Sequence, residues 1–127
     1  MYDRPDGQNL LETARKVFIA EIVPALPAGS RYTALMIANA MAIAQREIAA
    51  GDAPLAAECE RLRALLSEPS ATPAGAALRS VLGGYNRRLA AEIRAGRFDG
   101  EDRAALLEHL RRTTEEKLAV SNPKMLK

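Results

Sequence analysis

The stretch ALMIANAMAIA, at positions 34–44, constrains the fold of this chain more than any other. Its only polar residue is Asn39, so a helix here would be apolar on every side. Such a helix has to be buried nearly all round. We therefore expect it to lie at the centre of the fold or of an assembly. The run is too short to span a bilayer, which takes about 20 residues, so no membrane contact is expected.

The remaining sequence contains four more helical patterns and no strand-like alternation. The patterns predict an all-α, compact bundle of about five helices, with the second helix central. At 127 residues the chain can bury a core as one domain, residues 1–127. The predicted helices run from about 7 to 23, 31 to 51, 52 to 66, 73 to 95 and 100 to 121.

The fourth predicted helix contains two consecutive glycines, Gly83 and Gly84, which cost it about 2 kcal/mol relative to alanines. Thr72 is predicted as its N-cap, with Pro73 in the first turn. The apolar residues on both sides of the glycines keep one helical phase, so we expect a continuous helix. The third helix carries a core stripe of Leu55, Cys59, Leu62, Leu65 and Leu66.

The composition argues against several functional classes. Cys59 and His109 are the only residues of their types, so no metal site, cofactor or catalytic residue is predicted. His109 lies among charged residues and is expected on the surface. A net charge of +2 and few aromatic residues do not indicate nucleic-acid binding. The lone cysteine and the absence of an apolar leader behind MYDRPDG favour the cytoplasm.

The second helix has two different faces. Ile37, Met41, Ala44 and Ile48 form an apolar face, which we expect inside the monomer. The opposite face is mixed and consists of Tyr32, Leu35, Asn39, Ile43 and Arg46. This mixed face is either a second core face, with Asn39 satisfied by a neighbouring helix, or the interface of a homo-oligomer or the floor of a pocket. We expect a homodimer that contacts through Tyr32, Leu35, Ile43 and Arg46.

The fifth helix has polar residues within its apolar stripe, Thr114 and Lys117. In one interpretation the Lys117 stem passes the core and its charge lies in solvent. In the other, Thr114 and Lys117 join Asn39 and Arg111 at a site for a small anionic ligand. An amide left unpaired in a core costs about 1–3 kcal/mol, so we expect Asn39 within reach of Thr114 or Lys117.

Charges on the last two helices have a local explanation. The fifth helix offers three i,i+4 ion pairs, which leave little net charge: Glu108–Arg112, Arg111–Glu115 and Arg112–Glu116. The fourth helix ends in arginines without acidic neighbours on their face, and they form a solvated face or dock an acidic partner: Arg87, Arg94 and Arg97.

Three short parts of the chain resemble one known family. They are Asp3-Arg4-Pro5-Asp6 with Leu10-Leu11, then Ala38-Asn39-Ala40 with Ala42-Ile43 and Arg46-Glu47, and finally Leu110-Arg111, Thr113-Thr114, Lys117-Leu118-Ala119-Val120 and Asn122-Pro123. The family is an uncharacterised bacterial domain of unknown function, small and helical. Its members are often encoded beside aminoglycoside-phosphotransferase-like kinases and acyl-CoA dehydrogenases. The resemblance therefore implies an accessory role in acyl-CoA or small-molecule metabolism, with such an enzyme as partner.

The sequence thus favours a non-catalytic accessory or interaction protein that acts as a homodimer. The alternative is an anion-binding protein or enzyme that uses the polar cluster around Asn39.

Overall fold

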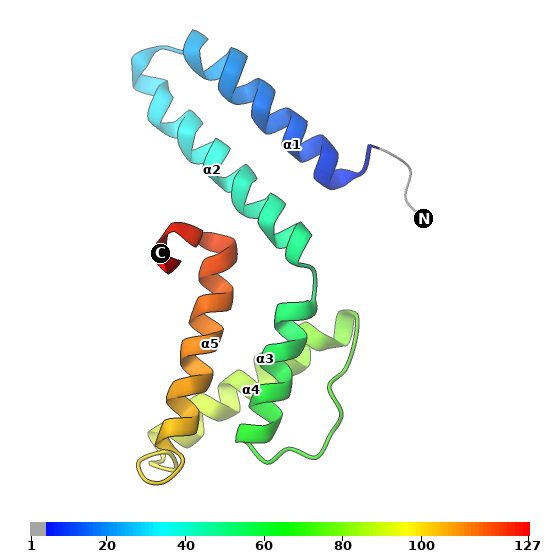
Figure 1. Cartoon of the computed structure of the whole chain (residues 1–127), viewed down its shortest axis with the longest axis vertical. Coiled ribbons are helices and arrows are strands. Elements are labelled where there is room, and N and C mark those ends of the chain that lie inside the picture. Colours follow the sequence, from blue (N-terminus) through cyan, green and yellow to red (C-terminus); the bar gives the residue numbers. More distant parts are fainter. Residues whose placement is uncertain (1–4) are drawn as a thin grey trace. The chain divides into compact units, whose positions relative to one another are not determined.

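The computed structural model describes residues 5–127 and contains five α-helices and no strand among them (Figure 1). The all-α prediction is confirmed. Asp3 and Arg4, which contribute to the family resemblance, lie outside the described residues. The helices are α1 (Gly7–Val17), α2 (Ala28–Ala50), α3 (Ala53–Leu65), α4 (Ala76–Arg94) and α5 (Arg103–Ser121).

The chain divides into two compact units. Unit 1 contains the described residues up to Gly51 together with Ala119–Met125, and unit 2 contains Asp52–Leu118. The expectation that residues 1–127 fold as a single domain stays a prediction. None of the described helices is long and apolar enough to cross a membrane.

In unit 1, α1 and α2 form an antiparallel hairpin (Figure 1). Asp6 caps α1 as a capping box, because its carboxylate accepts from the Asn9 amide at 2.9 Å and the Asn9 side chain accepts from the Asp6 amide. A π-helical turn (Phe18–Ile22) and a 3-10 turn (Val23–Ala25) then end the first helical segment at Pro24.

Within the monomer, the 34–44 helix is not buried nearly all round, so the expectation that Ile37 and Ile48 lie inside the monomer is wrong. Only Ala34 and Ala38 of α2 are buried, whereas Ile37 is 46 % exposed and Ile48 is 52 % exposed. The reason is that α1 covers one stripe of α2, and a single neighbouring helix cannot cover the remaining sides. The Arg15 side chain marks this contact, because its Nε donates to the Ala38 carbonyl at 2.9 Å.

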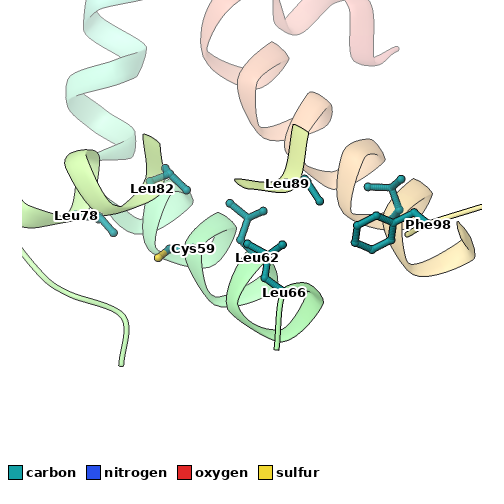
Figure 2. Packing of buried hydrophobic residues seen from close by; sticks show 8 residues of the cluster. Cys59, Leu62, Leu66, Leu78, Leu82, Leu89 and Phe98 are labelled. Atoms are coloured by element: carbon teal, nitrogen blue, oxygen red, sulfur yellow. The ribbon is translucent and has the colours of Figure 1, made fainter. Parts of the chain in front are cut away.

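Unit 2 holds the main hydrophobic core, which lies between α3 and α4. In Figure 2, Cys59, Leu62 and Leu66 project from the α3 segment toward residues of α4. The predicted core stripe of the third helix is confirmed, since these three residues are buried and Leu55 and Leu65 pack against them. The other buried members of the cluster are Leu78, Leu82, Leu89, Phe98 and Leu106.

Helix α4 begins at Ala76, so the predicted start at Pro73 is wrong. Gly75 precedes it with φ +66°, a conformation that suits glycine, and the Thr72 hydroxyl donates to the Glu60 carboxylate instead of capping the helix. The helix is continuous through Gly83 and Gly84, as predicted.

Replacing both Gly83 and Gly84 with alanine is expected to raise the free energy of unfolding by about 2 kcal/mol, because alanine loses less backbone entropy in a helix. An added Cβ meets only the Arg87 guanidinium, at 3.5 Å from Gly83 and 3.9 Å from Gly84. Urea unfolding measures the effect. Gly75→Ala is the matched control and should destabilise, because its φ is positive. A double variant no more stable than wild type would contradict this account.

Candidate functional site

Unit 2 contains a buried polar cluster formed by α3 and α5. Glu58 of α3 is 3 % exposed and His109 of α5 is 4 % exposed. The expectation of a surface His109 is therefore wrong. Its sequence neighbours Glu108, Arg111 and Arg112 are exposed, but His109 itself follows buried Leu106 by three residues and shares its side of the helix.

Arg61 lies at the edge of this cluster and forms a bidentate ion pair with Glu116. Its two terminal nitrogens donate to the Glu116 carboxylate at 2.9 and 2.8 Å, and one also donates to the Thr113 hydroxyl at 3.2 Å. The predicted Arg112–Glu116 pair is wrong, because Glu116 binds Arg61. The other two predicted pairs, Glu108–Arg112 and Arg111–Glu115, are confirmed.

Burial disfavours the charged forms of Glu58 and His109. It raises the pKa of Glu58, against the opposing charges of Lys117 and Arg61. Burial also lowers the pKa of His109, and the Arg61 charge lowers this pKa further. Within the described part of the chain, Glu58 Oε1, Arg61 Nε and His109 Nδ1 have no hydrogen-bond partner. Each of these buried polar atoms without a partner therefore costs the folded state free energy.

An open cavity of about 510 Å³ borders the cluster. It is lined by Arg61, Ala64, Leu65, Ser67, Arg97, Asp102, Ala105, Glu108, His109 and Arg112. Its arginines already have carboxylate partners: Glu116 for Arg61, Glu92 for Arg97 and Glu108 for Arg112. The cavity therefore has a polar lining, and the charges of these three arginines are balanced by carboxylates of unit 2. Residues 5–127 contain no group of acidic, histidine or cysteine side chains arranged to hold a metal.

The predicted ligand residues of α5 are mostly engaged locally. The Thr114 hydroxyl donates to the Leu110 carbonyl at 2.8 Å, and Arg111 pairs with Glu108 and Glu115. Lys117 is exposed, and its charge acts on Glu58 and His109. Asn39 belongs to unit 1 and is exposed, so water can satisfy its amide. The expectation that Asn39 reaches Thr114 or Lys117 stays a prediction.

The predicted interface residues lie on the side of α2 that α1 does not cover. At 100° per residue the mixed face is centred about 120° from Ala34 and Ala38. Tyr32 is 74 % exposed and Leu35 is 54 % exposed. Ile43 and Arg46 are half-buried, and Arg46 Nε donates to the Val120 carbonyl at 2.6 Å.

Exposed apolar side chains are concentrated in the α1–α2 hairpin and the turns that join its helices. The large apolar residues exposed there are Leu10, Val17, Ile19, Ile22, Tyr32, Leu35, Met36, Ile37 and Ile48. In addition, no charged residue occurs in α2 between positions 32 and 45. This uncharged part of α2 is about 21 Å long. It is exposed at Tyr32, Leu35, Met36 and Ile37 and half-buried over positions 41–45.

Comparison with known proteins found no similar curated protein and no similar solved structure. One family, described as Domain of unknown function (DUF6285), matches residues 24–125. The match includes α2, α3, α4 and α5 and leaves out α1. Because this match covers most of the chain, the protein belongs to the DUF6285 family.

Proposed function

We propose that this chain is a non-catalytic interaction protein that acts as a homodimer through the α1–α2 hairpin. The observation that carries the proposal is the uncharged surface of α2 between positions 32 and 45, on which Tyr32, Leu35, Met36 and Ile37 are exposed. Large exposed apolar patches are rare on monomers and usually mark an interaction site.

The energetics favour a partner for this surface. Each apolar Å² removed from water contributes about 25 cal/mol, so covering several half-exposed leucine, isoleucine and tyrosine side chains stabilises an assembly. A hairpin whose buried α2 residues are only Ala34 and Ala38 gains little of this within itself. A second copy of the chain supplies an equally uncharged surface.

The proposed setting is the cytoplasm of a bacterium, where the dimer assists an enzyme of acyl-CoA or small-molecule metabolism. Support for this part comes from the resemblance and from the single free cysteine, Cys59. A kinase-like protein or an acyl-CoA enzyme is the proposed further partner.

The alternative, binding of a small anion by Asn39, Arg111, Thr114 and Lys117, has less support. Arg111 is bound by two carboxylates, and the Thr114 hydroxyl is bound by the helix backbone. An anion would have to displace Glu108 or Glu115 from Arg111, which lowers its affinity.

Leu35→Glu is expected to dissociate the dimer. A glutamate at this place would have to bury an unpaired charge in the interface, which costs several kcal/mol and weakens association by at least about tenfold. Light scattering and analytical ultracentrifugation measure the mass over a range from about 1 to 200 µM, which detects a dissociation constant on the order of micromolar.

Leu107→Glu is the matched control, since Leu107 is a helical leucine of unit 2 with 52 % exposure. It should leave the dimer intact. A wild-type chain that stays monomeric at the highest concentration would refute the proposed homodimer. Equal loss of mass in both variants would show that the effect is not specific to α2.

A further inference from the structure

The spacing of the residues on the mixed face of α2 is the same in both directions. Its members follow each other at intervals of 3, 4, 4 and 3 residues: Tyr32, Leu35, Asn39, Ile43 and Arg46. Asn39 is therefore the midpoint, with an aliphatic residue four positions away on each side. The next members, Tyr32 and Arg46, lie seven positions from Asn39. A surface with this arrangement is complementary to itself when a second copy runs in the opposite direction.

We infer that two copies of α2 pair antiparallel across a two-fold axis that passes beside Asn39. This inference rests on the proposed homodimer and specifies its geometry. In a two-fold contact, residue i meets residue j and j meets i. With the axis at Asn39, Leu35 of each copy lies opposite Ile43 of the other, and Tyr32 lies opposite Arg46.

Asn39 then has a role that an apolar residue could not fill. Two amides related by a two-fold axis can each donate an N–H to the carbonyl oxygen of the other. A single asparagine in an apolar helix contact fixes the register, because any shift leaves both amides unpaired. This explains why the one polar residue of the 34–44 run stands at the midpoint of the mixed face.

The charges at the ends of the uncharged surface are opposite in sign across an antiparallel contact. Arg31 lies eight residues before Asn39, and Glu47 lies eight residues after it. Antiparallel pairing therefore puts Arg31 of one copy at the same level as Glu47 of the other, on opposite flanks of the contact. Parallel pairing would put like charges at the same level, which repel each other.

Arg46 is compatible with this contact. The two copies of Arg46 lie about 21 Å apart along the helix pair, which exceeds the screening length of about 8 Å at physiological salt. The Val120 carbonyl accepts from Arg46 Nε, so the terminal nitrogens remain for other contacts. A guanidinium held in this way can lie over the ring of the second copy's Tyr32 as a cation–π contact.

Disulfide cross-linking tests the register. Asn39→Cys places two cysteines at the axis, close enough for a disulfide, whereas two cysteines in Leu35→Cys are offset by about 12 Å along the helices, beyond the limit of about 7 Å. Under mild oxidation we expect Asn39→Cys to form a covalent dimer at least about tenfold faster than Leu35→Cys. The wild-type chain is the control, because its Cys59 is fully buried.

A mixture of Leu35→Cys and Ile43→Cys chains keeps Asn39 and tests the same register independently. The mixture should cross-link, while neither variant alone should. If Leu35→Cys cross-links as fast as Asn39→Cys, or if the mixture fails although light scattering shows dimers, the inferred register is overturned and the homodimer stands. If the wild-type chain scatters as a monomer, the proposed function itself fails.

Discussion

Replacing Leu62 with alanine is expected to lower the free energy of unfolding by about 2–5 kcal/mol. Leu62 is fully buried in the α3–α4 core, among Cys59, Leu66, Leu78 and Leu82 (Figure 2). The loss combines the transfer free energy of the removed atoms with the cost of the cavity they leave. An effect of this size is a large fraction of the stability of a typical small domain.

Urea unfolding followed by circular dichroism measures this loss. Leu107→Ala is the matched control, since its side chain is about half exposed, and it should change stability by no more than about 0.5 kcal/mol. If residues 1–127 form a single domain, the Leu62→Ala chain should also unfold in one transition, with unit 1 lost together with unit 2. Equal effects of the two leucine substitutions would contradict the observed core.

The core stripe of α3 was predictable because it depends on local spacing. Cys59, Leu62 and Leu66 recur at three- and four-residue intervals and therefore share one side of any helix. The continuity of α4 was predictable for the same reason, since its apolar residues keep their phase across Gly83 and Gly84. The start of α4 at Ala76 could not be predicted in this way, because the Thr72 hydroxyl donates to Glu60 of α3 instead of capping α4.

The burial of α2 could not be predicted from its composition. An apolar run shows that a helix gains from being covered, but it does not show which element covers it. Here α1 packs on Ala34 and Ala38, and the larger residues Ile37 and Ile48 stay exposed. The same exposure is what supports an interface between two copies.

The buried polar cluster was missed because its members come from two helices. Glu58 follows Leu55 by three residues and precedes Leu62 by four, so it belongs to the core side of α3, and this spacing was the available signal. The charges flanking His109 in the sequence pointed to the surface. The pairing of Arg61 with Glu116 joins residues 55 positions apart, which no local pattern reveals.

Replacing Glu58 with methionine is expected to stabilise the chain by about 1–3 kcal/mol at pH 8, because an apolar side chain of similar size fills the site without a buried, unpaired carboxylate oxygen. Glu58 is buried, its Oε1 has no hydrogen-bond partner within the described residues, and burial raises its pKa. Arg61 keeps Glu116 as its partner in the variant. Glu58→Gln removes only the charge and should therefore give a smaller gain.

The pH dependence distinguishes this mechanism from better packing. Because the folded state raises the pKa of Glu58 above 4.5, its contribution to stability is complete below pH 4.5 and is lost as the pH rises through the folded pKa. The lowered pKa of His109 acts in the opposite sense, and its contribution is lost as the pH falls below 6.5. The gain from Glu58→Met should therefore be larger at pH 8 than at pH 4.5, and the rise in stability due to His109 should remain in the variant.

Glu60 provides the matched control on the same helix. Its exposed carboxylate accepts from the Thr72 hydroxyl, and this hydrogen bond lowers its pKa, so its contribution to stability is present above pH 4.5 and is lost as the pH falls through the folded pKa. Glu60→Gln should therefore destabilise at pH 8, with the opposite sign to Glu58→Met. Guanidinium unfolding at pH 4.5, 6 and 8 measures both variants. A Glu58→Met gain that is the same at every pH would show that packing, and not the charge of Glu58, limits the stability of the α3–α5 cluster.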